Sequence, residues 1–199
     1  MKTPRRLVSV LSVPLFAAFL GSSASADIFN YQAFLSGPNE SPANASPGTG
    51  FATLDYNNIL HTMHLHVTFS GLTGTTTASH IHAATPSPFS GTAGVATTTP
   101  TFAGFPLGVT SGTYDNTLDL TLASSYNPSY VTANGGTTAS AELALTSAIA
   151  AGEAYLNIHS STFPGGEIRG FLQPVPEPSA LGLLGIGGLL AWAKRRRMI

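Results

Sequence analysis

Three histidines have the spacing that transition-metal sites use. His80 and His82 are separated by one residue in "SHIHAAT", and His159 follows far downstream in "YLNIHSST". Alternate side chains of a β-strand point to the same face, so His80 and His82 would present both imidazoles on one side. A third imidazole from a neighbouring strand would complete a three-nitrogen site suited to copper or zinc. The pattern therefore predicts a metal site at His80, His82 and His159, provided that the two segments lie side by side.

A second pair with the same spacing, His64 and His66, allows two interpretations. These imidazoles could add ligands to the first three, which makes them weaker candidates for the same metal, or they could be independent surface residues. Either way, alternation places both side chains on one face of their strand.

The same histidines could instead serve as scaffold without any ion. In this alternative, His80, His82 and His159 belong to a structural polar network with three further residues, namely Asn157, Glu167 and Arg169. Asn157 and Glu167 could also support a metal as direct or outer ligands. Arg169 is expected to pair with an acid and to fix the final strand.

Hydrolytic catalysis has little support in the sequence. The chain has neither a G-x-S-x-G motif nor a cysteine, and no glycine-rich phosphate loop precedes a helix. Asp115 and Asp119 could form a glycosidase pair, but acids on a strand are more often solvated. We therefore expect no catalytic residues and no enzyme activity, with a redox-metal enzyme as the alternative left open.

The elements that would position these residues are mainly strands. Apolar and polar residues alternate or nearly alternate in segments bounded by Gly, Pro, Asn or Ser, which predicts half-buried antiparallel strands. The segments are 28–35, 50–57, 61–72 and 112–122, with a final hairpin of 153–160 and 166–173. An Ala- and Leu-rich stretch, 139–152, predicts one short helix ended by Gly152. The expected fold is an all-β, antiparallel β-sandwich.

Alternation also assigns the side chains to faces. Ile81, Leu156, Ile158 and Ile168 are expected on the core side of their strands. The polar and ionisable side chains of these strands are then expected on the opposite face. In segment 61–72 the core side is expected to be lined by Met63, Leu65, Val67 and Phe69.

The N-terminal residues 1–26 have the layout of a secretory signal peptide. A basic start precedes an apolar run, and the small residues Ala24, Ser25 and Ala26 predict cleavage after Ala26. An uncleaved N-terminal anchor is the alternative. Residues 27–173 then form one domain.

The C-terminal residues 174–199 have three parts. The triplet Pro176, Glu177 and Pro178 precedes an apolar, glycine-rich stretch, and the basic cluster Lys194–Arg197 follows it. The apolar stretch falls short of a comfortable membrane span, yet the basic end is typical of a cytoplasmic terminus. We expect a hydrophobic transmembrane helix in this stretch. A permanent tail anchor with a Pro-rich stem is the alternative.

Without the two ends, the domain is acidic. Arg169 is its single basic side chain against eight carboxylates, a net charge of −7 before the histidines are counted. Nucleic-acid binding is therefore disfavoured, because phosphate neutralisation needs Lys and Arg. Binding of cations, or solubility outside the cell, fits better. The absence of cysteine excludes thiol and iron–sulfur chemistry.

Two resemblances follow from these motifs. The strings "TASHIH", "AGEAYLNIH" and "GGEIRG" resemble a CHRD domain, the module named from chordin. The resemblance implies an immunoglobulin-like or superoxide-dismutase-like β-sandwich. The tail resembles the PEP-CTERM sorting signal of bacteria, which implies export, cleavage by an exosortase-type protease and a location at the cell surface or outside the cell. By this resemblance, the C-terminal helix holds the protein at the inner membrane only transiently.

Together the resemblances imply a secreted structural or binding module of the extracellular matrix, with exopolysaccharide or another matrix component as its partner. The alternative is an extracellular copper- or zinc-binding protein that uses the histidine cluster.

Overall fold

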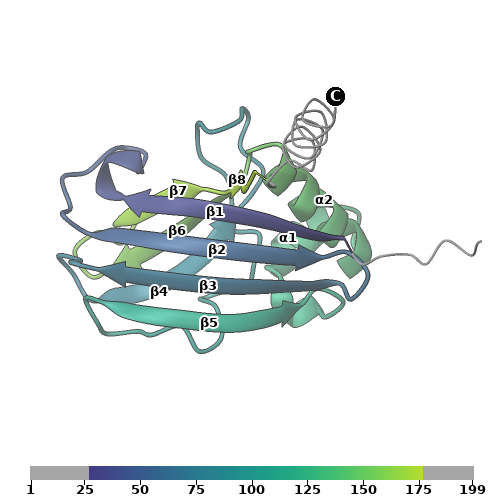
Figure 1. The fold of residues 1–199 in the computed structure, drawn as a ribbon, viewed down its shortest axis with the longest axis horizontal. Helices are drawn as coiled ribbons and strands as arrows, with labels where there is room; N and C mark the ends of the chain where they lie inside the picture. Colours follow the sequence, from purple (N-terminus) through teal and green to yellow (C-terminus); the bar gives the residue numbers. More distant parts are fainter. Residues whose placement is uncertain (1–26, 177–199) are drawn as a thin grey trace, which may run out of the picture.

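The computed structural model describes residues 27–176, which form a curled antiparallel sheet with two helices (Figure 1). The strands are β1 (Ile28–Ser36), β2 (Thr49–Asn57), β3 (Thr62–Ser70), β4 (Thr76–His82), β5 (Gly112–Asp119), β6 (Tyr155–Ser160), β7 (Ile168–Phe171) and β8 (Gln173–Pro174). The helices are α1 (Pro128–Ala133) and α2 (Thr138–Ala150), and the short 3₁₀ turns are η1 (Gly37–Asn39) and η2 (Ala123–Ser125).

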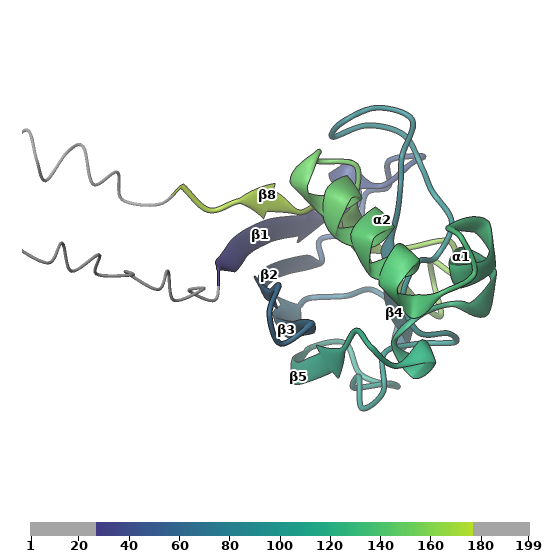
Figure 2. The same cartoon turned by 90° about the vertical axis from the view of Figure 1, so that its right-hand side faces the viewer.

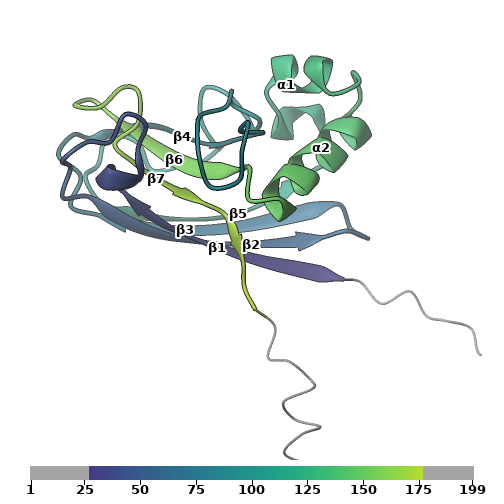
Figure 3. The ribbon, with the colours of Figure 1, turned by 90° about the horizontal axis from the view of Figure 1, so that it is seen from above.

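The sheet folds back on itself to make two layers. Its strand order is β4-β6-β7-β1-β2-β3-β5, with β8 added to β1. Strands β1, β2, β3 and β5 form one layer, and β4, β6 and β7 form the other (Figure 3). A single pairing, Ser36 with Arg169, joins β1 to β7 at the bend. The expected all-β class is confirmed, while the closer immunoglobulin-like or superoxide-dismutase-like assignment stays an expectation from the resemblance.

The apolar core lies between the two layers, as alternation predicts. Ile81, Leu156, Ile158 and Ile168 have no exposed surface, and they meet the apolar faces of β1, β2 and β3. Met63, Leu65 and Val67 are likewise fully buried, with Phe69 at 4% exposure. The predicted inward faces are therefore confirmed.

Two helices, and not the expected single one, cover one end of the layers (Figure 2). Helix α2 matches the predicted 139–152, and Gly152 follows it with a φ of +73°, a conformation that glycine adopts without steric cost. Helix α1 was missed because it has only six residues, although Asn127 caps it and Pro128 opens it.

Loops cover most of the outer face of β4, β6 and β7, so that His80, Asn157 and Arg169 are buried and His82 and His159 are partly buried. The segment after β4 runs back along the strand's free edge, where the Thr97 and Thr101 hydroxyls accept the amide protons of Ile81 and Ser79. The amide of Phe102 in turn donates to the Ser79 carbonyl. This loop therefore supplies hydrogen-bond partners to backbone groups along the edge of β4 that would otherwise stay unpaired.

Several predicted features lie outside the described residues. They are the signal peptide 1–26 with Ala26, the sorting residues Glu177 and Pro178, and the C-terminal hydrophobic helix. Among residues 27–176, no helix has the length and apolar character that crossing a membrane requires.

Candidate metal centre

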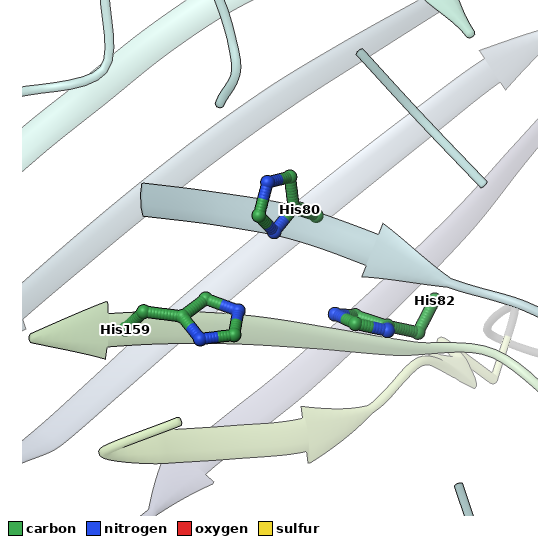
Figure 4. Close-up of side chains that lie close together, drawn as sticks. All are labelled: His80, His82 and His159. Carbon is green, nitrogen blue, oxygen red and sulfur yellow. The ribbon is translucent and has the colours of Figure 1, made fainter. Parts of the chain in front are cut away.

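Strand pairing brings the two histidine motifs together. β4 and β6 are antiparallel neighbours in which Ala78 lies opposite His159, His80 opposite Asn157 and His82 opposite Tyr155. Alternate residues of a strand and their direct partners on the neighbouring strand point to the same side. The three imidazoles therefore lie on the same face of the sheet. Figure 4 shows the rings of His80, His82 and His159 turned toward a common space. The juxtaposition that the sequence predicted is therefore present.

Each imidazole is held through one nitrogen by a backbone carbonyl. His80 Nε2 lies 2.5 Å from Pro100 O, His82 Nδ1 lies 2.9 Å from Ala93 O, and His159 Nδ1 lies 2.8 Å from Pro164 O. A carbonyl oxygen only accepts hydrogen bonds, so the nitrogen that faces it must carry the proton. The loops thus fix the tautomer of all three rings.

The second nitrogen of each ring is left with a lone pair. His80 Nδ1, His82 Nε2 and His159 Nε2 are buried, and no hydrogen-bond donor among the described residues reaches them. One ring nitrogen from each histidine lies within 4.8 Å of the other two. Metal–imidazole bonds of about 2.0–2.1 Å put tetrahedral ligand atoms about 3.3 Å apart. Small rotations of the rings would therefore complete a three-nitrogen coordination set.

The surroundings keep the imidazoles neutral. Burial lowers the pKa of all three histidines, and the neighbouring histidines lower it further at His80 and His82. For His82 the pKa falls to about 4, with the Arg169 charge as a further cause. Only a neutral imidazole offers a lone pair to a metal, so the lowered pKa values favour the ligand form of the three histidines.

An aromatic wall bounds the cluster beside His82. The Tyr155 ring is stacked on the imidazole with centroids 4.8 Å apart and planes inclined by 5°. The Arg169 guanidinium carbon lies 4.7 Å from the centre of the same ring, and the Phe171 ring is 5.4 Å from it. Tyr155 is 4% exposed, so this wall restricts the rotation of His82.

Asn157 and Arg169 share a partner that the sequence did not indicate. Glu40, from the loop after η1, accepts a hydrogen bond from Asn157 Nδ2 at 2.8 Å and lies 3.9 Å from Arg169 Nε. Arg169 also donates to the carbonyls of Asn39 and Gly91. The expected acid partner of Arg169 is thus Glu40.

Glu167 belongs to a different set of contacts. Its carboxylate accepts from Ser46 Oγ at 2.6 Å and from the amides of Thr73 and Gly74. These contacts tie β7 to the loops after β1 and β3. The three clustered histidines hydrogen-bond to backbone carbonyls, so Glu167 does not hold their rings in this structure.

His64 and His66 lie elsewhere, on the exposed face of β3. His64 Nε2 and His66 Nδ1 each lie 2.9 Å from one oxygen of Asp115 on β5. They occupy the other layer of the sheet, with 41% and 37% of their side chains exposed. The structure therefore separates this pair from the His80, His82 and His159 cluster.

The residues that complete the cluster have weak sequence signals. Pro100 and Ala93 contribute only backbone oxygens from an irregular loop, and Glu40 lies in another loop. The segment between the two strands of the predicted final hairpin contains Pro164, but nothing in its sequence indicates that Pro164 O would hold His159.

The fold and the cluster define an acidic β-domain with a three-imidazole centre, and the family is shown by comparison. Residues 31–172 match the model of the CHRD domain, and residues 174–197 match the PEP-CTERM protein-sorting motif. The chain belongs to the CHRD-domain family and carries a PEP-CTERM sorting signal. Neither a curated protein nor a solved structure matches the chain.

The sorting motif indicates the general cellular location of the protein. A PEP-CTERM signal implies processing by an exosortase and export to the cell envelope or beyond. The expectation of an exported, exosortase-sorted CHRD protein is thereby confirmed.

Proposed function

We propose that this CHRD domain binds one copper or zinc ion through His80 Nδ1, His82 Nε2 and His159 Nε2. The observation that carries the proposal is the convergence of three buried lone pairs that no protein donor satisfies. Buried polar groups without partners cost free energy, which a bound cation would recover. Imidazole nitrogen is a preferred ligand of both metals.

The second ring nitrogens strengthen the proposal. In metal sites the non-ligating nitrogen of a histidine usually donates to a carbonyl or carboxylate, which fixes the ring and its tautomer. All three rings already make this contact with backbone carbonyls. The carbonyls therefore hold the three imidazoles in the tautomer that metal binding requires, even in the absence of a metal.

We propose a binding role in preference to catalysis. The carboxylates that the sequence raised as a possible glycosidase pair are both engaged locally. Asp115 accepts from His64 and His66, and Asp119 accepts from the Thr121 hydroxyl at 2.6 Å.

Titration calorimetry of the untagged protein with Cu²⁺ and Zn²⁺ tests the metal site. We expect one tight site per chain, and we expect His82→Ala to weaken it at least a hundredfold. His64→Ala is the matched control, because it removes an exposed imidazole from the other layer, and it should leave the tight site unchanged. Equal binding by His82→Ala and the parent would refute the proposal.

A role as a matrix-binding module is a second candidate, favoured by one surface feature. Phe34 and Phe89, 68% and 53% exposed, flank a hollow of about 490 Å³ that Glu40, Arg169 and Gln173 also line. Exposed aromatic faces beside planar polar groups suit the rings and hydroxyls of an exopolysaccharide. Binding of neutral oligosaccharides that Phe34→Ala and Phe89→Ala abolish would support this candidate, and unchanged binding by both variants would exclude it.

We further propose that the protein is anchored in the inner membrane only until the exosortase cuts it, and that it then resides at the cell surface or outside the cell. The sorting motif supports this sequence of events. Mass measurement of the native protein tests it, as set out in the Discussion.

A further inference from the structure

Asn157 occupies the centre of the face that carries the three histidines. Its neighbours across the sheet are His80 on β4 and Arg169 on β7, and its neighbours along β6 are Tyr155 and His159. Directly opposed residues of antiparallel strands have Cβ atoms about 4.5–5.5 Å apart. The Asn157 amide is therefore beside the proposed metal centre, yet it does not hydrogen-bond to any of the three imidazoles.

The orientation of this amide is fixed by its nitrogen. Asn157 Nδ2 donates to Glu40 Oε1 at 2.8 Å, and Glu40 sits on the Arg169 side of the face. Gly166 closes the same side, because a Cβ there would lie 2.5 Å from Asn157 Nδ2. The two arms of an amide diverge by about 120°, so Oδ1 points away from Glu40.

The amide oxygen is a fourth unsatisfied acceptor. Asn157 is 2% exposed, and no donor among the described residues reaches its Oδ1. A metal ion satisfies the three imidazole lone pairs, but an amide oxygen beside it calls for a hydrogen-bond donor. Three protein ligands also leave a fourth position on a tetrahedral metal. A water molecule at that position would meet both needs.

We infer that the metal centre keeps one coordinated water and that Asn157 Oδ1 accepts a hydrogen bond from it. This inference rests on the proposed metal site and adds its fourth ligand. Asn157 is thus a positioning residue, which acts on the metal through the water. The ligand class at the open position is a small neutral donor such as water, since the amide oxygen disfavours a group that can only accept.

Pulsed electron paramagnetic resonance of the protein with substoichiometric Cu²⁺, in H₂O and in D₂O, tests the inference. In the parent we expect couplings from three imidazole nitrogens together with strong couplings from exchangeable protons. Asn157→Leu should keep the three nitrogen couplings and the weak couplings of the imidazole N–H protons, lose the strong exchangeable-proton couplings and bind copper 10–100-fold more weakly.

Glu40→Gln is the matched control, because its side-chain carbonyl can still accept from Asn157 Nδ2, and it should retain the water signal. Three imidazole couplings without strongly coupled exchangeable protons in the parent would overturn the inference and leave the metal site intact. An unchanged water signal in Asn157→Leu would also overturn it. Fewer than three imidazole couplings in the parent would overturn the metal site itself, and this inference with it.

Discussion

The His82 imidazole lies parallel to the Tyr155 ring, with centroids 4.8 Å apart and planes inclined by 5°. The two residues are direct partners across β4 and β6, so the stack follows from strand register. The Arg169 guanidinium also contacts the Tyr155 ring, which leaves the tyrosine little freedom. The stack therefore holds His82 in the orientation that directs Nε2 toward the other two histidines.

Loss of this stack should weaken metal binding. We expect Tyr155→Leu to lower Cu²⁺ affinity about tenfold, because groups that orient a metal ligand contribute at that scale. Tyr155→Phe keeps the ring and should stay within about twofold of the parent. Calorimetric titration checks both values, and equal affinity in Tyr155→Leu and the parent would show that the stack does not position His82.

The core between the layers predicts a large stability effect at Ile158. This side chain is fully buried, so Ile158→Ala should lower the free energy of unfolding by about 2–5 kcal/mol. Leu143→Ala is the control, because Leu143 is 69% exposed on α2, and it should change stability by less than about 0.5 kcal/mol. Urea unfolding measures both, and a parent-like Ile158→Ala would contradict the assigned face.

The lowered pKa of His82 predicts a pH dependence for the metal-free protein. Burial, above all, lowers this pKa to about 4 in the folded state, against about 6.5 in the unfolded chain. Between these values the unfolded chain binds the extra proton, so this group's contribution to stability falls as pH drops from about 6.5 to about 4. Nuclear magnetic resonance should show the His82 ring titrating near pH 4, and a midpoint near 6.5 would contradict the burial argument.

Protonation of Glu40 changes the stability of the protein with pH in the direction opposite to that of His82. The two effects must therefore be measured separately. Burial raises the pKa of Glu40 to about 7, against the lowering effects of Arg169, the Ser41 backbone and Asn157. The folded protein then holds the proton, and this contribution is lost as pH rises from about 4.5 to about 7. Relative to Glu40→Gln, the parent should lose stability over that interval in urea unfolding. Parallel pH profiles of the two proteins would rule out a raised pKa.

The ends of the chain predict two cleavages in the exporting organism. The mature protein should begin at Asp27, because small residues precede that point, and should end near Pro176, Glu177 and Pro178. Intact-mass measurement of the native protein identifies both ends. A product that retains the basic residues Arg195–Arg197 would contradict exosortase cleavage.

The sequence was most informative where one residue type alternates with another. Alternation placed Ile81 and Ile158 in the core and His80, His82 and His159 on the opposite face, because side-chain direction in a strand depends only on local backbone geometry. Partner strands follow from long-range topology instead. The pairing of β4 with β6, on which the cluster depends, therefore does not follow from the alternation of residues.

Loop contacts could not be predicted for a related reason. Pro100, Ala93 and Pro164 hold the histidines through backbone oxygens, which every residue has, so their side chains give no sign of the role. Glu40 meets Asn157 across a large sequence separation from an irregular loop. The same loops bury a face that alternation alone would leave exposed.

Thermal unfolding with and without Zn²⁺ or Cu²⁺ is the measurement that tests the three-histidine site most directly. A ligand that binds only the folded state at 100 times its Kd stabilises it by about 2.7 kcal/mol, which raises the Tm of a domain of this size by roughly 5–11 °C. We predict a rise of this order for the parent and for His66→Ala, and none for the His80→Ala, His82→Ala, His159→Ala triple variant. An equal rise in the triple variant, or no rise in the parent at neutral pH, would contradict a metal centre at these histidines.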